Sequence, residues 1–245
     1  MRDALAFLLV ACLGLAAGRA DARDIVADLS EHEIRITADF AGEELLLFGV
    51  TERGDDVVVV VRGPDTPVVV RRKERVLGIW MNLRSIQFGR VPSYFYVAAT
   101  PGLDERALSN LLSFNRIGLD RFPIDTTEPA SPEEVTEFRE ALVRNKQVQQ
   151  LYAAETGAVT RVGDVLFRTR IPFPSNVLTG AYRVEVYQVR DGRMIQATTT
   201  PLRVTKTGVG AYISSFAHEN SAAYGLIAII VAAMAGWLGG LVFRK

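Results

Sequence analysis

The sequence has very few cysteines and histidines, the residues that many enzymes and metalloproteins use for nucleophilic catalysis and metal binding. Its 245 residues include one cysteine, Cys12, and two histidines, His32 and His218. Neither histidine lies at a metal-binding spacing from another candidate ligand. The chain also has no Gly-x-Ser-x-Gly nucleophile elbow, no P-loop and no dinucleotide-binding fingerprint. We therefore expect no metal and no cofactor, and we predict that the protein is not an enzyme.

A basic excess is missing too. The chain has 28 lysines and arginines against 28 aspartates and glutamates, so its formal net charge is zero. A nucleic-acid-binding protein needs an excess of positive charge to neutralise phosphates, and this balance argues against that class. Acid–base chemistry would fall to the carboxylate pairs Asp55–Asp56 and Glu133–Glu134. The first lies in a turn pattern and the second at a helix start, so each has a structural explanation.

Residues 221–243 lie in the longest uncharged stretch of the chain and are followed directly by Arg244 and Lys245. A helix of this length reaches roughly 34 Å, and the hydrocarbon core of a bilayer is about 30 Å thick. We therefore predict a transmembrane helix over 221–243. Basic residues stay on the cytoplasmic side, so 244–245 is predicted to be a cytoplasmic tail and the bulk of the chain periplasmic, at a bacterial inner membrane.

The N-terminus has an apolar run over residues 4–17, with small residues at Gly18, Ala20 and Ala22 after it. This pattern predicts a secretory signal peptide over 1–22. Two alternatives stay open, a lipoprotein signal with Cys12 as the lipidated residue and an uncleaved signal anchor. Cleavage near Ala22 would remove Cys12, and the mature protein would then have no disulfide or thiol chemistry.

Short β patterns fill much of residues 23–206. Residues 33–40 alternate apolar and polar side chains, and Val57–Val61 is a run of five valines, which favours a strand. Residues 45–50 form a continuous apolar run, as expected for a strand covered on both faces. Strand patterns resume at 164–206, where Pro172 and Pro174 are expected to break the ladder. We predict a mainly β fold with a helical insertion, an Ig-like antiparallel β-sandwich.

The helical insertion covers about residues 103–155. Ser131-Pro132-Glu133-Glu134 is a strong helix start, with a capping box, and the pattern predicts a helix to about Ala154. Strands on both sides of the insertion form either one sandwich or two β modules. Residues 207–220 contain glycine and serine and are predicted to be a stalk before the membrane.

Two sets of residues are candidates for binding. The first is a basic cluster that follows Val68–Val70, with a tryptophan nearby; it is either an exposed hairpin connection or a site for an anion or an acidic partner. Its members are Arg71, Arg72, Lys73, Arg75 and Trp80. The second is a row of small residues on one face of the predicted span, which lets helices pack closely. These residues are Ala228, Ala232, Gly236 and Gly240.

Four segments, together with the signal and the C-terminal span, resemble a family of transmembrane proteins of alphaproteobacteria. These segments are residues 40–49, 78–82, 92–97 and 178–187. The family has no established activity, so the resemblance implies no catalytic residues. It points to a sulfite-exporter-type permease as a partner, for which the small-residue face would be the docking surface.

These observations lead to three hypotheses for function. The first is a membrane-anchored periplasmic accessory protein that binds another envelope protein, such as a transporter, or a second copy through the span. The second is an anion- or solute-binding module that uses the cluster at Arg71–Arg75. An envelope hydrolase has the least support.

Overall fold

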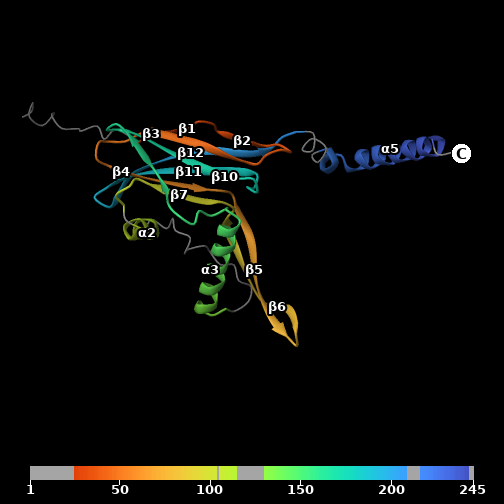
Figure 1. Ribbon diagram of the computed structural model, residues 1–245, viewed down its shortest axis with the longest axis horizontal. Helices are drawn as coiled ribbons and strands as arrows, with labels where there is room; N and C mark the ends of the chain where they lie inside the picture. The colour runs from red at the N-terminus through yellow and green to blue at the C-terminus, as the bar shows by residue number, and fades with distance from the viewer. Residues whose placement is uncertain (1–24, 104, 115–129, 209–215, 243–245) are drawn as a thin grey trace, which may run out of the picture.

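The strands form two facing sheets and one separate ribbon (Figure 1). The computed structural model describes residues 25–103, 105–114, 130–208 and 216–242. The predicted signal peptide 1–22, with Cys12, and the tail 244–245 lie outside the described residues. In chain order the strands are β1 (Val26–Leu29), β2 (Glu33–Ile36), β3 (Gly42–Val50), β4 (Asp56–Arg62), β5 (Asp65–Val76), β6 (Ile79–Pro92), β7 (Phe95–Ala99), β8 (Gly157–Ala158), β9 (Thr160–Val162), β10 (Leu166–Pro174), β11 (Gly180–Arg190) and β12 (Arg193–Lys206).

The helices are α2 (Glu105–Phe114), α3 (Pro132–Val148) and the C-terminal α5 (Ser221–Val242). The order in the four-stranded sheet is β1-β3-β10-β9, and in the six-stranded sheet it is β2-β12-β11-β4-β7-β8. Most neighbours are antiparallel, while β2 and β8 join the edges of the six-stranded sheet in parallel. The prediction of a mainly β fold with a helical insertion and one C-terminal helix is confirmed.

Strands from before and after the helical insertion pair directly in both sheets. In the four-stranded sheet β3 pairs with β10, with Val50 opposite Leu166. In the six-stranded sheet β4 pairs with β11, with Val61 opposite Val184. The strands on either side of the insertion therefore form one structure around a shared core.

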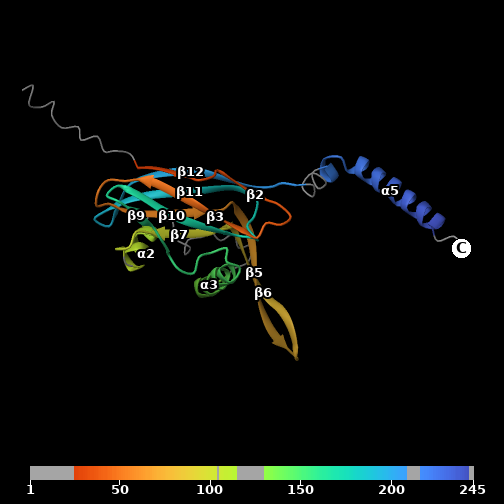
Figure 2. The ribbon, with the colours of Figure 1, turned by 45° about the horizontal axis from the view of Figure 1, so that its top comes forward.

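The valine run is the centre of that core. All five residues from Val57 to Val61 are fully buried, because the four-stranded sheet covers one face of β4, and α2 and α3 lie on the other side (Figures 1 and 2). The expectation that residues 45–50 are covered on both faces is wrong. Leu45 and Leu47 are buried, but Phe48 and Val50 are 40% and 42% exposed, because the outer face of the four-stranded sheet is open.

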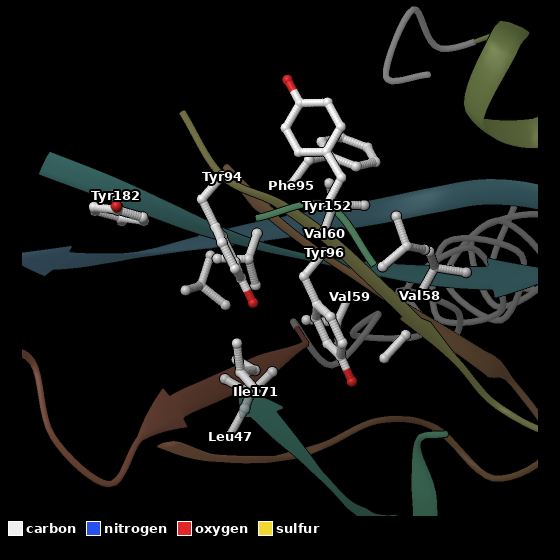
Figure 3. Packing of buried hydrophobic residues seen from close by; sticks show 14 of the residues in the cluster. Leu47, Val58, Val59, Val60, Tyr94, Phe95, Tyr96, Tyr152, Ile171 and Tyr182 are labelled. Carbon is white, nitrogen blue, oxygen red and sulfur yellow. The ribbon is translucent and has the colours of Figure 1, made fainter. Parts of the chain in front are cut away.

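The two prolines do not break β10, which pairs with β3 as far as Pro174. The carbonyl of Pro172 accepts a hydrogen bond from the Tyr94 hydroxyl, and that of Arg170 accepts one from Tyr96. Figure 3 shows both tyrosines directed from the start of β7 toward the other sheet. These carbonyls point away from β3, toward the edge of β10 that pairs with β9 only at residues 166–168, so a proline further along that edge removes no ladder hydrogen bond.

Helix α3 begins as the sequence predicted. The Ser131 side chain accepts a hydrogen bond from the Glu134 backbone N–H, and the Glu134 side chain accepts one from the Ser131 backbone, which closes the capping box. The helix ends at Val148, however, earlier than Ala154. Residues 151–153 instead pair with Phe95, because the backbone N–H of Phe95 donates to Leu151 and that of Ala153 donates back to Phe95.

Candidate functional site

The predicted basic cluster lies inside a strand. Residues 71–75 belong to β5, and the chain reverses direction further on, at Leu77 and Gly78. The interpretation of residues 71–75 as a hairpin connection is therefore wrong. The strand continues through the charged residues because the outer part of the β5–β6 ribbon lies beyond the sheets, so that it needs no apolar alternation (Figures 1 and 2).

The turn at the end of the ribbon has an unusual residue. Leu77 has φ of +50° and Gly78 has φ of +85°, as in a two-residue turn that matches the twist of a hairpin. Asparagine, aspartate or glycine normally occupies the first position, because a larger side chain there costs roughly 1–2 kcal/mol. Leu77 is 98% exposed, so no packing within the domain offsets this strain.

Leu77 is the centre of an exposed hydrophobic surface, which we name the apolar tip. This surface has six members. Three of them, Leu77, Ile79 and Trp80, are at least 66% exposed, and the remaining three are 37–51% exposed. Isolated exposed apolar residues are common in soluble proteins, but a contiguous group of large ones marks an interaction surface. The apolar tip consists of Val76, Leu77, Ile79, Trp80, Met81 and Leu83.

The ribbon has two chemically different faces near the tip. Val76 is opposite Ile79, and Met81 lies two residues further along β6, so these three side chains share one face. Trp80 is opposite Arg75 and lies on the other face. That second face, which we name the basic face, also carries the next alternate residues of β5, Lys73 and Arg71.

An ion pair with α3 holds the middle of the ribbon. Arg84 of β6 donates two hydrogen bonds to Glu134, from Nε to Oε1 at 2.8 Å and from Nη2 to Oε2 at 3.1 Å. These bonds to Arg84 hold the pKa of Glu134 below its usual range. Glu134 also completes the capping box of α3, so one carboxylate fixes both the helix start and the ribbon.

A second contact with α3 involves Arg72. Its Nη1 donates to Glu137 at 3.0 Å and its Nε to Glu74 at 3.0 Å, while the guanidinium lies 5.6 Å from the centre of the Phe138 ring. These partners raise the pKa of Arg72 and engage its Nε and Nη1 groups. Arg72 therefore acts as a brace, and an anion site on the ribbon would use the basic face.

The base of the ribbon is anchored in the core. Ile86, Phe88 and Val91 are at most 3% exposed, and Val70 is 8% exposed. The ribbon is thus buried at its base, held by ion pairs with α3 in its middle and exposed to solvent at the apolar tip. This arrangement presents the apolar tip in one position.

The small-residue row lies on α5. Within α5, Ser221–Gly240 is long and apolar enough to cross a membrane, and none of it is buried inside the protein. Ala228, Ala232, Gly236 and Gly240 lie on one face, since residues four apart are neighbours on a helix. A Cβ atom added to either glycine would meet no described atom within 4 Å. A helical turn over 216–219 precedes α5, at the end of the predicted stalk.

The carboxylates that could carry out acid–base chemistry have structural partners. Asp55 accepts two hydrogen bonds from Arg190 and one from Gln188, and Asp56 forms an ion pair with Arg161. His32 lies 2.8 Å from Asp28. Within the described ranges, no group of three or more His, Cys, Asp or Glu residues is placed to hold a metal ion.

An open groove of about 700 Å³ lies beside β10, between Glu44, Tyr96, Thr160 and Arg168. Several of its polar groups have partners within the protein. The Tyr96 hydroxyl donates to the Arg170 carbonyl, and the Arg170 side chain lies 3.9 Å from Glu44. The groove therefore supports a binding role less well than the apolar tip does.

Sequence analysis identified Trp80 but missed the other members of the apolar tip. Leu77 and Gly78 form the turn and Ile79 begins β6, so this segment lies outside the core of the two sheets. The available signal was that Val76, Ile79 and Met81 alternate with Arg75 and Trp80, so that the segment has no continuous polar face for solvent.

The sequence was compared with known proteins. A family model described as "Putative transmembrane protein (Alph_Pro_TM)" matches residues 24–245. The chain belongs to this family. No curated protein matches the sequence. Alph_Pro_TM membership agrees with the apolar helix α5, and the resemblance found in the sequence is confirmed.

Proposed function

We propose that this Alph_Pro_TM protein is a membrane-anchored accessory protein, without catalysis of its own, that binds another membrane protein such as a transporter. The observation that carries the proposal is the open small-residue face of α5, where no described atom lies beside Gly236 or Gly240. An anchor alone has no use for such a face, whereas close helix packing requires it. A second copy of the chain is the alternative occupant.

The topology is part of the proposal. Residues 1–22 would direct export and the β domain would lie in the periplasm. α5 would cross the inner membrane and leave 244–245 in the cytoplasm. A reporter that works only in the cytoplasm should be active when fused after Lys245. Activity of a periplasm-only reporter at that position would contradict the topology.

Site-specific photocrosslinking tests the docking face. A photoreactive residue at position 236 should give a crosslinked product in cells, and one at position 234, on the other side of α5, should not. Replacing Gly236 and Gly240 with leucine should abolish association in mild detergent, while Met234→Phe, which adds bulk on the other side, should preserve it. Two differently tagged copies distinguish a homodimer from another partner. Equal crosslinking at both positions would refute the proposal.

The anion-binding alternative has one specific observation in its favour. Arg71 and Lys73 make no ion pair with any residue that the structure describes. Calorimetry with phosphate and sulfate tests this alternative, and the α5 substitutions should leave such binding intact. An envelope hydrolase is less well supported, because Asp55 and Glu134 are engaged in ion pairs.

The Ig-like assignment is also a proposal. The Tyr182 hydroxyl, near the start of β11, donates to the carbonyl of Leu178 four residues upstream, at 2.7 Å. Tyrosine corners of Ig-like sandwiches make the same bond.

A further inference from the structure

The apolar tip has no partner in the described part of the chain, although the ribbon that carries it is anchored in the core and paired with α3. Its exposed side chains are carried beyond α3 by a ribbon that is anchored at Phe88 and braced at Arg84 (Figure 2). A leucine at position 77 is sterically disfavoured and contributes nothing to packing within the domain. Contact with a partner outside the domain therefore explains the leucine at position 77 better than the stability of the domain does.

We propose that the apolar tip inserts into the lipid–water interface of the membrane that α5 crosses, so that the domain contacts the bilayer at a second point. Because α5 is long and apolar enough to cross a membrane, a bilayer lies beside the domain and offers an apolar partner for the tip. The connection from β12 to the helical turn before α5 covers residues 207–215, which span at most about 32 Å. The domain is therefore held close to the membrane surface.

The arrangement of charge along the ribbon fits a lipid surface. Arg75 and Lys73 lie about 7 Å and 13 Å behind Leu77 along the strand, at about 3.3 Å per residue. Interfacial elements bury their apolar side chains about 5–10 Å deep, which places these two residues at the level of the phosphates. Anionic headgroups attract basic residues at that level, and long basic side chains can extend toward them.

Trp80 adds a chemical match. Tryptophan is enriched at membrane interfaces, where its ring lies among apolar groups and its N–H contacts the headgroups. Trp80 lies on the basic face, opposite Arg75, and so at the boundary between the apolar tip and the charged residues. A protein groove would need acidic walls complementary to the basic face, whereas a bilayer with anionic lipids already supplies both the apolar and the charged layer.

Tryptophan fluorescence provides a direct test, because the chain has only two tryptophans, Trp80 and Trp237. The full chain carrying Trp237→Phe is reconstituted into phosphatidylcholine vesicles with or without phosphatidylglycerol. We expect Trp80 emission to shift to the blue and to be quenched by lipids brominated near the headgroup. Quenching should increase with phosphatidylglycerol. The Trp80→Phe chain, in which Trp237 of α5 must be quenched by brominated lipid, controls for reconstitution.

Substitutions at the tip separate insertion from folding. Leu77→Asn suits the turn and so preserves the ribbon, but it should abolish quenching of Trp80 by brominated lipid. Lys73→Glu should remove the dependence on phosphatidylglycerol. Trp80 that is quenched by aqueous iodide and unaffected by brominated lipid would overturn the proposal. Emission that is shifted to the blue but insensitive to both quenchers would also overturn it, in favour of a protein contact. Neither result bears on the docking face of α5, because both measurements report only the surroundings of Trp80.

Discussion

The ion pair of Asp55 with Arg190 gives the most quantitative prediction. The Asp55 side chain is 4% exposed and accepts hydrogen bonds from Nε and Nη2 of Arg190, both at 2.7 Å. The Gln188 amide also donates to it. The bonds from Arg190 are the largest cause that holds the pKa of Asp55 below its usual range, against the opposing effect of burial.

Replacing Arg190 with methionine leaves the Asp55 carboxylate buried without its cation. Loss of one partner from a fully buried pair costs 3–5 kcal/mol, and Arg190 is 46% exposed, so we expect about 2–3 kcal/mol of lost stability. At roughly 2–4 °C per kcal/mol for a domain of this size, Tm should fall by about 4–12 °C. Asp55→Asn should cost less, because it leaves a half-exposed guanidinium that still contacts Glu52.

Thermal unfolding of the full chain in mild detergent, followed by near-ultraviolet circular dichroism at pH 7 and pH 4.5, tests both points. In the natural protein the folded pKa of Asp55 is lowered, so its stabilising contribution is present above the unfolded pKa and lost as pH falls through the folded value. In Arg190→Met burial becomes the largest influence on the Asp55 carboxyl and raises its pKa, against the smaller lowering effects of Gln188 and Arg161. The Tm deficit of this variant should therefore shrink at pH 4.5.

Two results would refute this reasoning. If Arg190→Met lowers Tm no more than Asp55→Asn does, the carboxylate is not the costly buried charge. If the deficit of Arg190→Met is the same at both pH values, the loss comes from packing rather than from an unpaired ion.

Two further predictions concern packing. Tyr94→Phe removes the hydroxyl that donates to the Pro172 carbonyl and should cost about 1–2 kcal/mol in denaturant unfolding; an unchanged midpoint would mean that water replaces the bond. Gly49→Ala would place a Cβ atom 2.4 Å from the Val26 carbonyl oxygen and 2.6 Å from the Phe167 ring, so it should destabilise the domain by about 1–3 kcal/mol. Gly225→Ala, with open space around it, should leave Tm unchanged, and equal effects of the two would contradict the packing argument.

Signals within short segments of the sequence predicted much of the fold. Val57–Val61 predicted a buried strand because β-branched side chains disfavour a helix, and Ser131–Glu134 predicted a helix start because its side chains cap the backbone within a few residues. Such interactions depend on neighbours in the chain, so no tertiary structure is needed to see them.

The sequence-based predictions were wrong where contacts with an element distant in the chain determine the local structure. Pro172 and Pro174 remain in a strand because β9 pairs with that edge of β10 only at residues 166–168, and because Tyr94 donates a hydrogen bond to the Pro172 carbonyl. Helix α3 ends at Val148 because residues 151–153 pair with Phe95.

By itself, the sequence determined that the chain carries an apolar segment of membrane-spanning length, because length and lack of charge are properties of a single segment. Only the tertiary structure decided which apolar residues of the ribbon are exposed. Leu77, Ile79 and Trp80 are exposed to solvent. Ile86 and Phe88 lie in the same strand as Ile79 but are buried. Apolar residues look alike in a sequence whether or not they are covered, and exposure depends on where the sheets end and the ribbon extends beyond them.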